Sequence, residues 1–96
     1  MNEEIRAYLE EHNPEAILWD NCDSALLGTA RIKRDDVWTI VAMYSYELLI
    51  LHFMGEFNNS EETVSDRQLE EEAMEWVDYN IVGAYVGPHT PMIVYS

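Results

Sequence analysis

Apolar residues recur along this chain with two different spacings, and these spacings predict where helices and strands lie. Over residues 2–12 the apolar positions include Ile5 and Leu9, one helical turn apart, with glutamates between them. The same period recurs over residues 46–55 and 66–82. Each of these two segments follows a serine, whose hydroxyl can accept a hydrogen bond from a free backbone N–H of the first turn. The sequence therefore predicts three helices.

Strand spacing dominates the stretch between the first two helices. A hairpin is predicted over about residues 24–44, with the polar residues 33–36 as its connection. Its second strand is apolar or aromatic on both faces, which is typical of a central strand covered on both sides. Residues 92–95 form a short apolar strand, expected beside the hairpin. The chain is thus predicted to be one α+β domain, residues 1–96, in which three helices pack on a small antiparallel sheet.

The last predicted helix combines an apolar stripe with an acidic remainder. It begins with a capping box formed by Ser65 and Gln68, and Gly87-Pro88 stops any continuation. The residues expected to be buried on this helix are Leu69, Ala73, Trp76, Val77 and Asn80. Its carboxylates are expected to face away from the core.

Composition adds a strong charge to this picture. Nineteen acidic and five basic residues give a formal net charge of −14, whereas 48% of the chain is hydrophobic. A magnitude of about 2–8 suffices to keep a small domain soluble. Direct nucleic-acid binding needs clustered lysine and arginine, and an anionic membrane would repel this chain, so neither partner is expected. A basic protein surface is the partner that this charge favours.

The side chains that usually carry catalysis or metals are sparse. Cys22 is the single cysteine, so neither an internal disulfide nor a cysteine-based zinc site is expected. No pair of histidines has metal-ligand spacing, and the calcium-loop pattern fails after Asp20-Asn21-Cys22-Asp23. We therefore expect no metal, no cofactor and no enzyme activity. Without a signal-peptide pattern or a membrane-length apolar run, the expected location is the cytoplasm.

The acidic helix is the first candidate binding surface. Five acids from Glu70 to Asp78 cover about 12 Å of axis, roughly one charge per 3 Å. Phosphates of one DNA strand are spaced by about 3.4 Å along the axis, so the charge density is comparable. A solvated helix face produces the same periodicity, and both interpretations stay open. The predicted partner-binding residues are Glu61, Glu62, Asp66, Glu70, Glu71, Glu75 and Asp78.

The segment after this helix is the second candidate. Asn80 falls on the predicted apolar stripe, and the turn after Gly87-Pro88 carries His89 and Thr90. Together with Tyr44, these polar side chains predict a small ligand pocket at the Asn80–Thr90 corner. A tight packing corner without a ligand is the other interpretation.

Two motifs carry a resemblance to a known family. The segment Asp23–Gly28, "DSALLG", and the spaced pattern Asn80-x-x-Gly83-Ala84-Tyr85-x-Gly87-x-x-Thr90-Pro91 resemble short uncharacterised proteins of tailed phages and prophage-bearing bacteria. The chain departs from that pattern at "RIKRDDVWTI", where the family has a shorter, less aromatic connection. The resemblance implies a phage setting and no established activity.

Charge and resemblance together predict a function in protein binding. The expected activity is non-enzymatic inhibition of a host protein through its basic, nucleic-acid-binding surface, as a DNA mimic or an anti-defence factor in the host cytoplasm. A module that binds a small ligand at the corner is the alternative. Homodimerisation or a homo-oligomeric structural role, favoured by the two apolar faces of the second strand, is also left open.

Overall fold

A hairpin of two strands is followed along the chain by a pair of helices, and the third strand comes last. The computed structural model describes residues 2–19, 21–58 and 65–95. Within these ranges the elements are α1 (Asn2–His12), a 3-10 turn η1 (Asp23–Ala25), β1 (Leu26–Arg34), β2 (Val37–Ser45), α2 (Tyr46–Phe57), α3 (Asp66–Val77), a π-helical turn η2 (Asp78–Val82) and β3 (Met92–Val94). Three helices and a three-stranded sheet confirm the α+β class.

The sheet has the order β1-β2-β3, so the second strand of the hairpin is central, as its apolar faces predict. β1 and β2 are antiparallel and are joined through Asp35 and Asp36, both with positive φ as in a type I′ hairpin turn. β3 lies parallel to β2, so the sheet is mixed and not wholly antiparallel. The chain leaves β2 and returns through α2 and α3, and a long crossover of this kind is what a parallel pair requires.

Local capping signals place the starts of the second and third helices. The hydroxyls of Ser45 and Ser65 each accept a hydrogen bond, at 3.2 Å, from the backbone N–H three residues later. α2 continues past the predicted end at Gly55 to Phe57, because Phe57 adds a ring contact to Trp76 of α3 at 6.4 Å between centroids. Tertiary contact between the two helices therefore extends α2 beyond its local stop signal.

The core lies between the sheet and the helices, where Tyr44, Leu49 and Val77 have no exposed surface. On α3 and η2 the buried stripe consists of Leu69, Ala73, Val77 and Ile81. The predicted burial of Trp76 and Asn80 is wrong. The backbone N–H of Gly83 bonds to the carbonyl of Asp78, a π-type step of five residues. This wider turn brings Ile81 to the core in place of Asn80.

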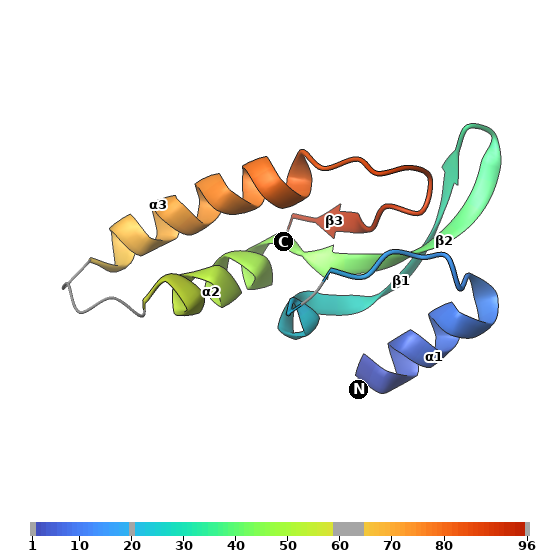
Figure 1. Ribbon diagram of the computed structural model, residues 1–96, viewed down its shortest axis with the longest axis horizontal. Helices are drawn as coiled ribbons and strands as arrows, with labels where there is room; N and C mark the ends of the chain where they lie inside the picture. The colour runs from blue at the N-terminus through green and yellow to red at the C-terminus, as the bar shows by residue number, and fades with distance from the viewer. Residues whose placement is uncertain (1, 20, 59–64, 96) are drawn as a thin grey trace.

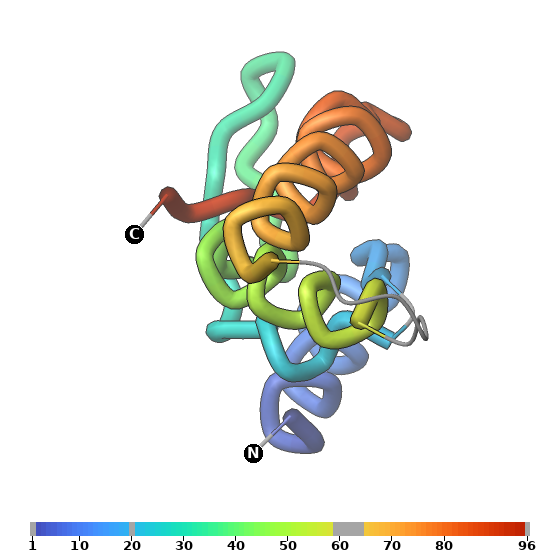
Figure 2. The backbone as a smooth tube through the Cα atoms, turned by 90° about the vertical axis from the view of Figure 1, so that its left-hand side faces the viewer, coloured from blue at the N-terminus to red at the C-terminus, as the bar shows by residue number. Residues whose placement is uncertain are grey.

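The molecule is elongated, with principal extents of 47 × 27 × 20 Å. α2 and α3 form an antiparallel helical pair at one end, whereas the β1–β2 turn lies at the other end (Figure 1). Viewed from the helical end, α3 lies beside α2, and α1 lies on the opposite side of α2 (Figure 2). None of the helices in the described ranges is long and apolar enough to cross a membrane.

Candidate functional site

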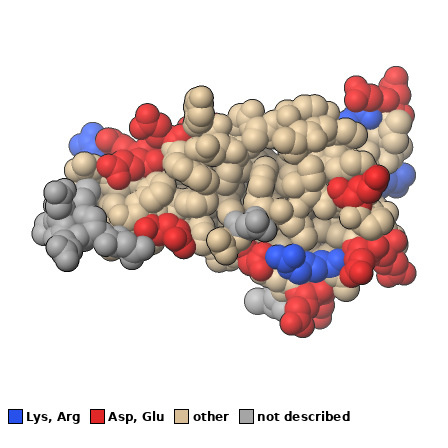
Figure 3. All heavy atoms as spheres, viewed as in Figure 1, with Lys and Arg blue, Asp and Glu red and all other residues tan. Residues whose placement is uncertain are grey.

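The acidic side chains of α3 and η2 are all exposed to solvent. Those within the described residues are Asp66, Glu70, Glu71, Glu72, Glu75 and Asp78. The predicted binding residues Glu61 and Glu62 lie outside the described residues. Acidic side chains gather over one end of α3, over α1 and near the hairpin turn, with a broad uncharged band between these regions (Figure 3). The charge is therefore divided among several surfaces.

The carboxylates of α3 also point to different flanks of the helix. Glu70 lines a groove on one flank, where α3 faces α2. Glu72 and Glu75 line a shallow depression on the other flank. Residues two and five positions apart do not share a helix face, which accounts for this separation. These three carboxylates are thus divided between two surfaces of one helix.

Two of these carboxylates already have a partner within the protein. Glu71 forms an ion pair with Arg67, with 3.5 Å between Oε1 and Nε, and both side chains are largely exposed. Asp78 accepts a hydrogen bond from the hydroxyl of Tyr46 at 2.7 Å. Burial, followed by this bond and the charge of Asp78, raises the pKa of Tyr46 to about 12. Tyr46 therefore stays neutral and donates to Asp78 at physiological pH.

Of the four other carboxylates, Glu70, Glu72 and Glu75 line the two surfaces, and like Asp66 they have no side-chain ion pair or hydrogen bond to any residue in the described ranges. Beside Glu72 and Glu75 lie two aromatic side chains, Trp76 with 39% of its surface exposed and Tyr79 with 84% exposed. A cationic side chain placed here could form an ion pair with the carboxylate and a cation–π contact with the ring at the same time.

The ring of Trp76 is supported by contacts within the protein. Phe53 of α2 packs against it at 4.2 Å between centroids. Asn80 donates a hydrogen bond from Nδ2 to the carbonyl of Trp76 at 3.0 Å, which places the amide on the same surface. We name the surface lined by Glu72, Glu75, Trp76, Tyr79 and Asn80 the acidic–aromatic depression. Because its indole is supported by these contacts, the ring would lose little freedom if a ligand packed on it.

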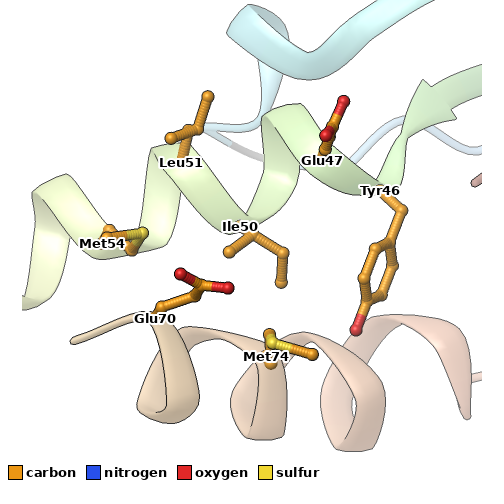
Figure 4. A pocket seen from close by; sticks show the side chains of 7 residues that line it. All are labelled: Tyr46, Glu47, Ile50, Leu51, Met54, Glu70 and Met74. Carbon is orange, nitrogen blue, oxygen red and sulfur yellow. The ribbon is translucent and has the colours of Figure 1, made fainter. Parts of the chain in front are cut away.

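The groove on the other flank has a volume of about 470 Å³. Its lining residues are Tyr46, Glu47, Ile50, Leu51 and Met54 from α2, with Glu70 and Met74 from α3. In Figure 4 the side chains of Ile50 and Met74 point toward one another between the helices. The sequence pattern predicted that Glu70 is exposed. It could not predict that Glu47 lines the same groove, because that depends on how α2 and α3 pack.

Tyr44 and Thr90 of the predicted corner pocket are structural residues. Tyr44 is fully buried, and its hydroxyl accepts a hydrogen bond from the backbone N–H of Trp19 at 3.0 Å. Burial raises the pKa of Tyr44. Thr90 is 5% exposed; its hydroxyl donates to the carbonyl of Gly87 and accepts from the N–H of Val86. Both hydroxyls are used in holding the chain together.

The other two residues of the predicted pocket lie elsewhere. Asn80 belongs to the acidic–aromatic depression. His89 has Nδ1 at 3.1 Å from Nδ2 of Asn13 and Nε2 at 3.3 Å from a carboxylate oxygen of Glu15. The cavities that Asn80 and His89 line include neither Tyr44 nor Thr90, and the contacts of Tyr44, His89 and Thr90 are those of a packing corner.

One polar cluster, formed by Ser24, His52 and Glu56, was not predicted from the sequence. The hydroxyl of Ser24 lies 3.3 Å from Nδ1 of His52, and Nε2 of His52 lies 3.9 Å from a carboxylate oxygen of Glu56. The four-residue spacing of His52 and Glu56 was a signal for this pair, but Glu56 lies just beyond the helix predicted over residues 46–55. A separation of 3.9 Å is too long for the hydrogen bond with which a carboxylate orients a general base. This cluster therefore lacks the geometry of an activated serine.

No group of three histidine, cysteine, aspartate or glutamate side chains in the described ranges could hold a metal ion. No family model, curated protein or solved structure matches the chain. The resemblance to short phage proteins consequently stays a prediction from the sequence.

Proposed function

We propose that this protein is a non-enzymatic binding protein whose α3 surface docks on a basic surface of another protein. The observation that carries this proposal is the acidic–aromatic depression, where Glu72 and Glu75 have no side-chain partner among the described residues and lie beside the exposed rings of Trp76 and Tyr79. An arginine or lysine side chain of the partner fits this chemistry, with its charge facing the carboxylates and its flat or aliphatic part against a ring.

The size of each contribution supports a docking role. An exposed ion pair contributes about 0–1 kcal/mol, and an exposed cation–π contact adds roughly 0.5–1 kcal/mol. Both increase when the partner excludes water from Trp76, whose ring is already supported by Phe53. Tryptophan and tyrosine are the residue types that most often dominate the binding energy of protein interfaces. The net charge of −14 adds long-range attraction to a basic partner and speeds encounter.

The partner follows from the setting that the phage resemblance implies. It is a host protein whose basic surface ordinarily binds nucleic acid, and occupation of that surface inhibits it in the host cytoplasm. The division of the carboxylates between two flanks of α3 favours docking of discrete cationic side chains over imitation of a continuous phosphate row. Glu71 supports the same distinction, because Arg67 already pairs with it.

The test is affinity capture from a bacterial lysate at low and high salt. The variant Glu72→Lys with Glu75→Lys reverses the depression, and Glu4→Lys with Glu11→Lys on α1 makes the same change in net charge elsewhere. We expect a basic protein to be retained by the wild type and by the α1 variant. It should be lost from the α3 variant and at high salt, because exposed charges are screened beyond the Debye length.

Two results would overturn the proposal. One is retention of the same basic protein by the α3 variant with unchanged affinity. The other is equal loss from both variants, which would mean that total charge and not the depression governs capture. Circular dichroism of each variant checks that the fold is intact.

A further inference from the structure

The groove between α2 and α3 has an apolar floor with a carboxylate on each side. Ile50 is 7% exposed at the bottom, whereas Leu51 is 60% exposed and Met74 is 38% exposed toward solvent. Glu47 belongs to α2 and Glu70 to α3, so the two helices each contribute one acid. Figure 4 shows these side chains around the space between the helices. The groove therefore offers apolar contact along its middle and negative charge at both walls.

The dimensions of the groove suit a helix. Its α2 wall runs over the nine residues from Tyr46 to Met54, and the eight helical steps between them, at 1.5 Å each, span about 12 Å. That length matches about two turns of an α-helix, enough for anchors at spacings such as i, i+3, i+4 and i+7. Met54 and Met74 add flexible thioether side chains, which adapt to differently shaped apolar partners.

Charge complementarity decides what kind of helix fits. Neither Glu47 nor Glu70 has an ion pair or hydrogen bond within the residues that the structure describes. We propose that the groove binds a basic amphipathic helix of the partner protein. Its leucine-like side chains lie on Ile50 and Met74, and its lysine or arginine side chains face Glu47 and Glu70. This inference rests on the proposed function and names the form in which the basic partner is presented.

A second copy of this chain is a poor occupant by the same reasoning. Each copy carries a net charge of −14, so two copies repel one another at every approach. The cations near the hairpin turn are also engaged. Arg31 lies over the ring of Trp38 at 5.0 Å, and Arg34 donates hydrogen bonds to the carbonyls of Pro88 and Thr90. A second copy thus offers little free positive charge to the groove walls.

The test uses two synthetic peptides as probes. Both have about 18 residues of leucine and lysine; in one the leucines share a helix face, and in its isomer the same residues are ordered so that they do not. Fluorescence anisotropy of labelled peptide against the wild-type protein measures both affinities. We expect the amphipathic peptide to bind at least about tenfold more tightly than the isomer, a difference of about 1.4 kcal/mol.

Variants locate the binding surface. Leu51→Gln with Met74→Gln should abolish the preference for the amphipathic peptide, because both side chains line the groove. Val37→Gln is the matched control: Val37 is 61% exposed, like Leu51 at 60%, but lies at the hairpin turn, away from the helical pair (Figure 1). It should leave the preference unchanged. Leu51→Gln alone should reduce the preference, and this exposed substitution keeps the test informative if the double variant unfolds.

Each other outcome overturns the groove proposal. Equal affinity for the two peptides, no binding of either peptide, or an unchanged preference in the Leu51 variants all do so. A wild-type dimer that the Leu51 and Met74 substitutions dissociate would assign the groove to a second copy. The proposed function is judged separately with Glu72→Lys and Glu75→Lys. If that variant weakens both peptides equally while the groove variants change nothing, docking through the depression survives and the groove proposal fails.

Discussion

Neutralising Glu72 and Glu75 should make the free protein more stable while weakening its binding to a basic partner. The perturbation is Glu72→Gln with Glu75→Gln, which keeps the size of both exposed side chains and removes two negative charges. Like charges three or four residues apart on a helix destabilise it. In α3 and η2 the pairs Glu71–Glu75, Glu72–Glu75 and Glu75–Asp78 have this spacing, and the double substitution removes all three.

The magnitude follows from these pairs. Each like-charge pair costs roughly 0.2–0.5 kcal/mol, so removing the three should raise the free energy of unfolding by about 1 kcal/mol. For a domain of this size, about 1 kcal/mol corresponds to a rise of roughly 4–8 °C in melting temperature.

Urea unfolding, followed by tryptophan fluorescence at low and at about 1 M salt, measures the effect. The difference between variant and wild type should shrink at high salt, where the Debye length falls to about 3 Å. Glu3→Gln with Glu4→Gln is the matched control, since both acids lie in the first turn of α1 and are favoured by its dipole. That control should not gain stability. An α3 variant that is no more stable than wild type, or whose gain is independent of salt, would refute the reasoning.

Three further outcomes are expected. Thr90→Val should lower the free energy of unfolding by about 1–3 kcal/mol in urea titrations, because its buried hydroxyl bonds two backbone groups. Calorimetry should show opposite shifts for two glycine variants: Gly55→Ala, in open space within α2, should stabilise by roughly 0.5–1 kcal/mol, and Gly87→Ala, at φ +112°, should destabilise by about 1–3 kcal/mol. Folding raises the pKa of Tyr46 from about 10 to about 12. The neutral phenol therefore adds to the free energy of unfolding in full below pH 10, and this stabilisation is lost as pH rises through 12. Tyr46→Phe, which removes the bond to Asp78, should therefore show a smaller alkaline loss of stability, measured by urea unfolding across this pH range.

Features set by neighbouring residues were predictable from the sequence. Ser45 and Ser65 cap their helices because a hydroxyl and an N–H three residues later meet whenever a helix starts there. The central position of β2 follows from apolar side chains on both of its faces. The exposure of the α3 carboxylates follows from helical periodicity alone. In each case the signal that predicts the feature lies within the residues of one element or one turn.

Features set by contacts between distant segments were not predictable. The parallel placement of β3 depends on the path of the chain through two helices, which no local pattern specifies. At the π-helical turn Ile81 is buried and Asn80 is exposed, whereas a strict α-helical period predicts that Asn80 is buried. Trp76 was expected in the core because it falls on the apolar stripe of the helix; instead its ring packs against Phe53 and Phe57 of α2 while 39% of the residue's surface stays exposed.

The two proposed binding surfaces share one helix but lie on different flanks of it, and this arrangement would limit the kind of partner that can use both. A single docked helix lies either in the groove beside Glu70 or on the depression beside Glu72, since these side chains leave α3 on different flanks. A partner that engages both must reach around α3 with a second segment. The depression, open and lined by exposed rings, suits one cationic side chain from a loop, whereas the groove suits a helix. Charge can attract many basic proteins to this chain, but only a partner with both elements at the right separation gains both sets of contacts, and specificity comes from that geometry and not from the net charge.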